Sequence, residues 1–252
     1  MKFKQVFAFT SVLLLCLSGA GSYPAAAPPA GGQMVVLLHG LGRTAKSMAS
    51  MQKRLTETGY TVFNYDYESR KNAINSLVDD LQDFLADCCL QSDIKLNFVT
   101  HSLGGILVRA LIAEKRPGNL GRVVMLSPPN KGSDVVDFFR EYPLFEYFFG
   151  QAAAELGTGR DSFPNRLGPA DFEVGIITGN RTIDPISSWI IGGADDGKVS
   201  IAQAKLEGMA DFMVVEVSHA FIMQNKDVID EVIYFLQNGR FSKPADALNN
   251  QK

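Results

Sequence analysis

Ser102 is the residue whose type and surroundings best suit it to chemistry. It lies in Thr100-His101-Ser102-Leu103-Gly104-Gly105, after an apolar run at 95–100 and before a helical pattern at 103–116. A serine of a G-x-S-x-G pattern between strand and helix sits on a strained turn that exposes its hydroxyl at the carboxyl edge of a sheet. Thr100 departs from the pattern by replacing the first glycine. We expect Ser102 to be a nucleophile; the alternative is a structural serine after a strand.

A serine nucleophile needs a base, and the chain has three histidines, His39, His101 and His219. A neutral imidazole is the usual base near pH 7. His101 adjoins the nucleophile, but the turn should aim its side chain elsewhere, and His39 ends the first apolar run, where a different role is available. His219 follows the last apolar run, on a loop expected at the same sheet edge. Elimination therefore favours His219 as the base. The alternative is that His219 is a loop histidine without a catalytic role.

The third member should be a carboxylate that precedes the histidine along the chain. Residues 189–193 resemble a strand, and Asp195 and Asp196 follow directly. The sequence Asp196-Gly197-Lys198-Val199 suggests a turn that presents Asp196. We favour Asp196 over Asp195, with Asp184 a more distant third.

Negative charge on a tetrahedral intermediate needs fixed donors, each worth roughly 3 kcal/mol. One should be the backbone N–H of Leu103, at the start of the helix in which Gly104 permits close packing. The other should be the N–H of Leu41, because Gly40 and Gly42 on either side let the backbone approach a substrate. The alternative for His39-Gly40 is a tight turn alone, which a role in binding the oxyanion does not exclude.

Alternating strands and helices must position these groups. Residues 74–85 place apolar side chains on one helical face, and further helical patterns lie at 45–58, 103–116 and 228–238. Short apolar runs predict strands at 34–38, 61–65, 95–100, 122–126, 172–177, 189–193 and 212–217. This alternation predicts an α/β fold, a mostly parallel sheet with helices on both faces, over residues 34–240, followed by a tail at 241–252.

Residues 127–171 interrupt the alternation and are expected to form a small cap insertion. Seven aromatic residues fall within 138–149, four of them at helical spacing that Pro143 interrupts. Their rings either line a pocket for an acyl chain or pack the insertion onto the domain. The sequence does not decide between the two.

The first 33 residues indicate export. Lys2 and Lys4 precede an apolar run at 6–17, too short to span a bilayer but suited to a signal peptide, and Ser18-Gly19-Ala20 suggests cleavage after residue 20. The alternative is an uncleaved anchor. Residues 21–33 read as a Pro/Ala/Gly linker. A periplasmic or extracellular protein is expected, with no integral membrane segment after cleavage.

Cys88 and Cys89 would be the cysteines left after such cleavage. Adjacent cysteines rarely bridge, because the geometry strains the intervening peptide. We expect two buried thiols at a helix end and a fold independent of a disulfide.

Composition narrows the function further. The 252 residues are 46% hydrophobic and 20% charged, with net charge −3 and pI near 5.7. These values suit one globular domain and argue against a nucleic-acid binder. Three scattered histidines argue against a multi-histidine metal site, and the expected chemistry needs no cofactor.

Taken together, His39-Gly40-Leu41-Gly42, the Ser102 motif, Asp196-Gly197-Lys198-Val199 and His219 resemble the α/β-hydrolase superfamily. They are most similar to bacterial secreted lipases and esterases with an H-G-x-G loop. Residues 128–133 also look like the segment leading into the cap of lipase-like members. The resemblance covers about 34–240 and implies Ser102, Asp196 and His219 as a triad with Leu41 and Leu103 as oxyanion donors.

The leading hypothesis is an exported serine hydrolase of carboxylic esters, acting on a small-molecule or lipid ester. An acyltransferase, thioesterase or amidase with the same triad is the alternative, since one constellation serves each reaction. A non-catalytic binding module is a remote third. The oligomeric state is left open.

Overall fold

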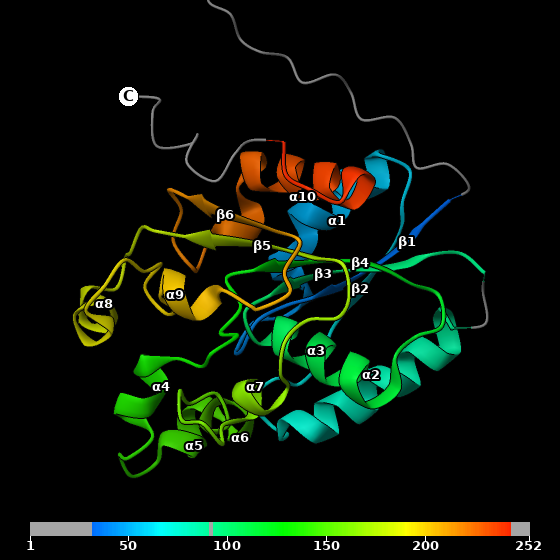
Figure 1. Cartoon of the computed structure of the whole chain (residues 1–252). Coiled ribbons are helices and arrows are strands. Elements are labelled where there is room, and N and C mark those ends of the chain that lie inside the picture. Colours follow the sequence, from blue (N-terminus) through cyan, green and yellow to red (C-terminus); the bar gives the residue numbers. More distant parts are fainter. Residues whose placement is uncertain (1–31, 91–92, 243–252) are drawn as a thin grey trace, which may run out of the picture.

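The computed structural model describes residues 32–90 and 93–242, built around a six-stranded parallel sheet (Figure 1). The strand order is β2-β1-β3-β4-β5-β6. Strand bounds are β1 (Met34–Leu38), β2 (Thr61–Tyr65), β3 (Leu96–His101), β4 (Leu120–Leu126), β5 (Val174–Gly179) and β6 (Asp211–Val215). The α/β prediction is confirmed, and each strand overlaps one of the predicted apolar runs.

Four helices cover the two faces of the sheet. Helices α2 (Ile74–Cys88) and α3 (Leu103–Lys115) pack on one face, and α1 (Ala49–Glu57) and α10 (Lys226–Asn238) on the other. Strand β1 serves both cores, because alternate side chains point to opposite faces: Val36 and Leu38 join the first, Val35 and Leu37 the second. This double burial explains why β1 is a continuous apolar run.

The strand register brings the ends of distant segments to one edge. Leu38 of β1 pairs with both Tyr65 of β2 and Thr100 of β3. His101 pairs with Leu126 of β4. Because all strands are parallel, the loops that follow them open at the same carboxyl edge, which is where α/β sheets bind ligands.

The remaining helices are short. They are η1 (Ala45–Met48), α4 (Asp134–Phe139), α5 (Phe145–Phe149), α6 (Gln151–Ala154), α7 (Phe163–Arg166), α8 (Pro185–Ile191), α9 (Ile201–Ala204) and η2 (Ile222–Gln224). Helices α4 to α7 belong to the β4–β5 connection, within the predicted insertion at 127–171. Pro143 and the left-handed Leu144 (φ 72°) separate α4 from α5, so the aromatic segment is two helices rather than one.

The strand predicted at 189–193 is wrong. Residues 189–191 are instead the last three residues of helix α8, which begins at Pro185. Gly192 follows in the left-handed conformation (φ 69°). Asp184 caps this helix by accepting a hydrogen bond from the N–H of Ser187. A proline at the first position and a glycine after the last are typical helix-boundary signals, and here they outweigh the apolar run.

The prediction for the cysteines is also wrong, because Cys88 and Cys89 form a disulfide with each other. Cys88 is the last residue of α2, and Cys89 has left the helical conformation (φ −136°), so the two side chains no longer diverge as helical neighbours do. The bridge joins adjacent residues, so it closes no long loop and constrains the unfolded chain little.

Two residues next to the predicted limits of the domain are hydrogen-bonded to strands of the sheet. Gln33, assigned to the linker, accepts a hydrogen bond from Thr61 N. Phe241, expected to start the tail, is buried and donates its N–H to Asp211. The predicted signal peptide, most of the linker and most of the tail lie outside the described residues. Of the helices in the described ranges, none is long and apolar enough to cross a membrane.

Candidate active site

Ser102 occupies a strained turn between β3 and α3. Its backbone has φ 51° and ψ −119°, a combination that a non-glycine residue rarely adopts. Two bonds hold the turn: Ser102 N donates to Leu126 O, and Gly105 N donates to Ser102 O. A Cβ on Gly104 would lie 2.9 Å from the carbonyl oxygen of His39, so only glycine lets α3 approach β1 here. The turn forms although Thr100 replaces the first glycine of the motif.

His219 lies between Ser102 and Asp196. Its Nε2 is 3.1 Å from Ser102 Oγ, and its Nδ1 is 2.8 Å from Asp196 Oδ2. A second bond ties the two loops together, because His219 N donates to Asp196 O at 2.8 Å. The three residues expected to work together are therefore brought into a continuous Ser–His–Asp hydrogen-bonded chain.

The Asp196 carboxylate is almost fully buried yet well satisfied. Besides His219, it accepts from the backbone N–H groups of Lys198 (3.0 Å) and Val199 (2.9 Å). Burial acts to raise the pKa of this carboxyl, but the nearby His219, its hydrogen bond and the Val199 N–H outweigh burial, so the pKa lies below its usual value. Asp196 is thus kept ionised, as a group that orients an imidazole must be.

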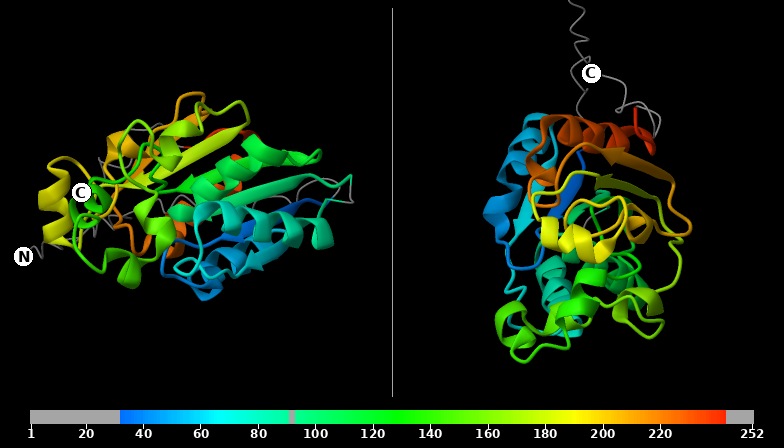
Figure 2. Two further views of the ribbon diagram at one scale, coloured as in Figure 1. Left: turned by 90° about the horizontal axis from the view of Figure 1, so that it is seen from below. Right: turned by 90° about the vertical axis from the view of Figure 1, so that its left-hand side faces the viewer.

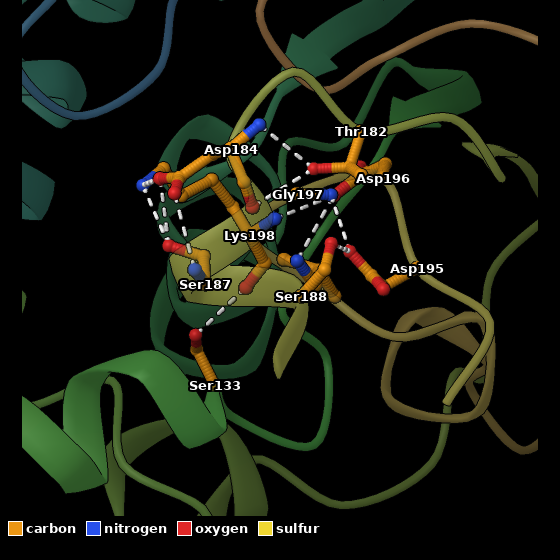
Figure 3. A network of polar contacts seen from close by, with 10 residues as sticks. Ser133, Thr182, Asp184, Ser187, Ser188, Asp195, Asp196, Gly197 and Lys198 are labelled. Carbon is orange, nitrogen blue, oxygen red and sulfur yellow. Dashed lines mark hydrogen bonds and ion pairs between the residues drawn. The ribbon is translucent and has the colours of Figure 1, made fainter. Parts of the chain in front are cut away.

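The two competing carboxylates support the loop that carries Asp196 (Figure 3). Asp195 accepts from Ser188 Oγ at 2.6 Å and from Gly197 N at 2.7 Å. Asp184 binds Lys198 Nζ at 2.7 Å, and this hydrogen bond is the main reason that the pKa of Asp184 lies well below its usual value. Neither is bonded to His219. Both join the loop to α8, so the structure favours Asp196 as the histidine's partner.

Leu103 directly follows Ser102, and Leu41 lines the same pocket as Ser102. Within 32–90 and 93–242, neither N–H donates to another protein atom. Leu103 is the first residue of α3, where N–H groups lack helical partners. The Leu41 loop is positioned by His39, which stacks on Tyr67 at 4.0 Å between centroids and whose carbonyl accepts from Tyr67 Oη at 2.5 Å. Both N–H groups are thus unpaired, as donors to an oxyanion would have to be.

His101 has a different role from the one its sequence position suggests. Its side chain lines the same pocket as Ser102, and its Nε2 lies 3.0 Å from the carbonyl oxygen of His219. Burial, reinforced by the neighbouring His219, lowers the pKa of His101 well below its ordinary value. A neutral His101 that donates from Nε2 would anchor the backbone of His219.

A pocket of about 600 Å³ opens above Ser102 and His219. The connection from β4 to β5 supplies one wall, which includes Val136, Phe139 and Phe145, and the α8 region supplies the facing wall with Ile183 and Ile186. Figure 2 shows these helices together at one end of the molecule. The pocket is lined mainly by apolar side chains and has reactive groups at its base, which suits a substrate with an apolar arm.

The aromatic residues of the connection divide between the two roles considered from the sequence. Phe139, Phe145 and Phe149 line the pocket, whereas Tyr147 and Phe148 are mostly exposed. The sequence could not tell the pocket-lining rings from the exposed ones. Such a distinction needs one continuous helical spacing, and Pro143 interrupts it.

Sequence reasoning missed several residues around the pocket. Arg43 and Lys198 line it, and Arg43 donates to the Ala220 carbonyl beside His219. Ile183 and Ile186 were not identified because the start of α8 at Pro185 was not recognised from the sequence. The Asp184-Pro185 pair was the available signal. Among the described residues, no group of three or more His, Cys, Asp or Glu side chains is placed to hold a metal ion.

Comparison with known proteins shows the family of the chain. The family described as serine aminopeptidase, S33, matches residues 32–164. A lysosomal thioesterase PPT2 homolog from Drosophila melanogaster is 29% identical over 138 residues, which are 50% of this chain and 48% of that protein. The chain thus spans about half the length of this curated relative.

Solved structures share the fold. Phospholipase PlaB from Legionella pneumophila has a TM-score of 0.68 at 17% identity, covering 88% of this chain and 63% of its own. Mature lipase BlEst2 from Bacillus licheniformis has a TM-score of 0.64 at 20% identity, covering 85% and 96%. The metagenomic carboxyl esterase MGS0156 has a TM-score of 0.63 at 17% identity, covering 82% and 71%. At these identities the likeness concerns the fold alone.

Proposed function

The chain belongs to the serine aminopeptidase S33 family of α/β-hydrolases, and from that premise we propose that it is a serine hydrolase of esters with an apolar acyl group. One observation carries the proposal: the Ser102–His219–Asp196 hydrogen-bonded chain lies at the base of a mainly apolar pocket. Among hydrolase sites, this pairing of a nucleophile with an apolar cavity suits an acyl ester best.

The proposed reaction has two halves. In the first, Ser102 Oγ attacks the ester carbonyl carbon while His219 Nε2 takes its proton, and the C–O bond then breaks as His219 returns that proton to the leaving alcohol. In the second, water attacks the acyl carbon while His219 Nε2 takes its proton, and the bond from that carbon to Ser102 Oγ then breaks as His219 returns the proton to Oγ, which releases the acid and restores the serine. Asp196 holds the Nδ1–H of His219 and stabilises the imidazolium. The Leu41 and Leu103 N–H groups bind the oxyanion in both halves.

The carboxylates of the pocket argue against an aminopeptidase activity. A site for a free α-amino group needs an available carboxylate, and the acidic residues lining this pocket are Asp184 and Asp196. Asp184 is paired with Lys198 and Asp196 with His219. The pocket therefore offers an amine no free counter-charge, whereas an uncharged acyl chain needs none.

Thioester cleavage is the second candidate, favoured by the relative described as a thioesterase. The same acyl chain would enter the same pocket, and only the leaving group would change from alcohol to thiol. Rates with an oxygen ester and a thioester of one acyl chain would rank the two activities. Free acid as the product with added alcohols present would argue against an acyltransferase.

The test of the nucleophile is labelling with a fluorophosphonate probe. We expect Ser102 to be modified, with Ser102→Ala losing both labelling and nitrophenyl-ester hydrolysis. Labelling that persists in Ser102→Ala would overturn the assignment. A correctly folded Ser102→Ala protein, checked by circular dichroism, is the required control.

Export remains a proposal as well. The basic and apolar pattern at the N-terminus suggests it. The Cys88–Cys89 disulfide supports an oxidising compartment, since such bonds are rare in reducing ones. Fractionation of the producing cells, with N-terminal sequencing of the protein, would test both export and cleavage after residue 20.

A further inference from the structure

Arg43 brings an unpaired positive charge to the active-site pocket. The lysine and arginine side chains that line the pocket are Arg43 and Lys198, and Lys198 is paired with Asp184. In the part of the chain that the structure describes, Arg43 forms no ion pair, and its guanidinium donates to the Ala220 carbonyl at 3.4 Å. A guanidinium has five N–H donors, so this one long bond leaves most of them available to a ligand.

A second arginine lies beside the first. Arg43 and Arg70 both line a cavity of about 220 Å³, which adjoins the active-site pocket because Arg43 lines both. A Cβ on Gly42 would lie 3.7 Å from Arg70 Cδ, so the Arg70 side chain runs against the loop that carries Arg43. Its guanidinium donates to the Phe148 carbonyl at 3.4 Å and, among the described residues, pairs with no carboxylate, that of Glu146 in α5 included. Two guanidinium groups with free donors thus share one cavity.

The acidic residues that line this cavity have other partners. Asp66 accepts a backbone hydrogen bond at 2.8 Å, and Glu68 forms an ion pair with Lys71 at 3.1 Å. The segments 41–46 and 66–71 together carry four basic and two acidic residues, although the whole chain has a net charge of −3. The surroundings of the cavity are therefore locally positive in an acidic protein, which favours an anionic ligand.

The position of Arg43 relates this cavity to one part of the substrate. In the proposed reaction the apolar walls hold the acyl chain, and His219 returns a proton to the leaving group. The Arg43 guanidinium contacts Ala220, the residue that follows His219. A group bound by Arg43 is therefore on the leaving-group side of the site. Between the apolar walls, by contrast, an anion would lose its hydration without compensation.

We propose that Arg43 and Arg70 bind an anionic group, a phosphate or a carboxylate, on the leaving group of the substrate. The inference rests on the proposed function, because it assigns the leaving group of the same reaction. Guanidinium groups bind both anions through paired N–H donors, and such charge-assisted bonds are stronger than those to neutral acceptors. The substrate class is thus an apolar acyl chain joined to a negatively charged alcohol or thiol.

The test compares soluble esters that share a hexanoyl group and differ in the charge of the alcohol. These are the esters of glycerol phosphate, of hydroxybutanoate and of uncharged glycerol, used below the concentrations at which they aggregate. We expect kcat/KM to be about tenfold higher for the phosphate ester than for the glycerol ester, because two guanidinium groups bind the added charge. Raising NaCl to about 0.5 M should reduce this preference. The hydroxybutanoate ester shows whether a carboxylate is sufficient.

Arg43→Gln and Arg70→Gln test the two residues separately. Each is expected to lower the ratio of kcat/KM for the phosphate ester to that for the glycerol ester by about fivefold or more, since one charged hydrogen-bond donor is lost. The ratio cancels any effect of a variant on the catalytic groups themselves. Lys46→Gln is the matched control, because Lys46 is an exposed cation of the same segment that lines neither cavity. It should leave the ratio unchanged.

Calorimetry with Ser102→Ala measures binding of glycerol phosphate without any reaction, and adding Arg43→Gln and Arg70→Gln should abolish that binding. A phosphate ester hydrolysed no faster than the glycerol ester would overturn the inference and leave the proposed function standing. An equal fall of the ratio in Lys46→Gln would also overturn it, because the effect would then come from net charge alone. Binding of glycerol phosphate without hydrolysis of any ester or thioester would instead refute the proposed function and leave the anion site intact.

Discussion

At the scale of single residues, the site depends on groups held where their chemistry is useful. Ser102 has a positive φ that costs of order 1–3 kcal/mol, and it persists because β3 and α3 over-determine the turn. Asp196 is buried but receives three hydrogen bonds, one of them from His219. These arrangements fix the nucleophile and the carboxylate before any substrate arrives.

The two neighbouring aspartates should respond very differently to substitution. Asp196→Asn removes the charge that holds His219 Nδ1–H, and we expect kcat for a nitrophenyl ester to fall by about 10⁴-fold. Asp195→Asn alters only the support of the loop from Ser188 and Gly197, so a loss of less than about tenfold is expected. Steady-state kinetics of both variants provide the measurement. A larger loss for Asp195→Asn would reverse the assignment.

His101 should make the stability of the fold depend on pH. Burial lowers its folded pKa well below the unfolded value of about 6.5. As the pH falls, the unfolded chain therefore binds a proton at this histidine before the folded protein does. The stability that is present above about pH 6.5 is lost progressively below that pH. The slope is at most about 1.4 kcal/mol per pH unit for this residue.

Urea denaturation between pH 5 and 8 would measure this slope. Another buried histidine, His39, also has its pKa lowered by burial and contributes in the same direction. His101→Gln should make the slope shallower while its amide can still donate to the His219 carbonyl. An unchanged slope would mean that His101 is not its source.

At the scale of elements, the connection between β4 and β5 is fastened to α3 by one buried cation. Arg109 of α3 donates to the carbonyl oxygens of Asn130, Pro164 and Gly168 and to the Asn130 side chain. Burial lowers the pKa of Arg109 to about 10, so it stays charged near neutral pH. The pocket wall made by this connection therefore rests on α3, the helix that follows Ser102.

Replacing this cation should loosen the wall. Arg109→Met leaves buried carbonyl oxygens without donors, and we expect unfolding free energy to fall by about 2–4 kcal/mol. Arg116→Ala is the control, because its pair with Asp171 is exposed at the surface and should be worth less than about 1 kcal/mol. Chemical denaturation of both variants is the measurement. Equal losses would show that the buried contacts do not anchor the connection.

At the scale of the whole molecule, the pocket exists because segments far apart in sequence meet at one edge of the sheet. The connection after β4 forms one wall, α8 the other, and the loops after β3 and β6 form the base. Lys198, in the loop that carries Asp196, contacts both walls. Its carbonyl oxygen accepts a hydrogen bond from Ser133 Oγ, just before α4, and its Nζ binds Asp184, just before α8. Pocket shape and carboxylate position are thus set by one polar network.

The volume of the pocket should determine acyl-chain preference. Phe139→Trp adds bulk inside the pocket and should lower kcat/KM for long-chain nitrophenyl esters about tenfold relative to short ones. Phe138→Trp is the matched control, since this neighbour in α4 is exposed and outside the lining. Identical chain-length profiles for the two variants would show that the pocket does not hold the acyl chain.

The sequence by itself determined the six strands of the sheet, although it added a seventh at 189–193 in error, and it determined the main helices and the candidate residues Ser102, Asp196 and His219. Those features depend on local apolar periodicity and on motifs a few residues long, which a chain displays without folding. It could not separate Asp195 from Asp196 by more than a preference, nor identify α8, because an apolar run of a few residues fits a strand or a helix equally well.

Only the tertiary structure decided which side chains meet. The bond from His101 to the His219 backbone, the Cys88–Cys89 disulfide, the Arg109 anchor and the division of the aromatic residues between pocket and surface were all absent from the sequence reading. The physical reason is that each depends on side-chain direction, or on a contact between elements that packing creates. Spacing along the chain specifies which face a residue occupies, but the partner on that face is chosen only when the elements pack together.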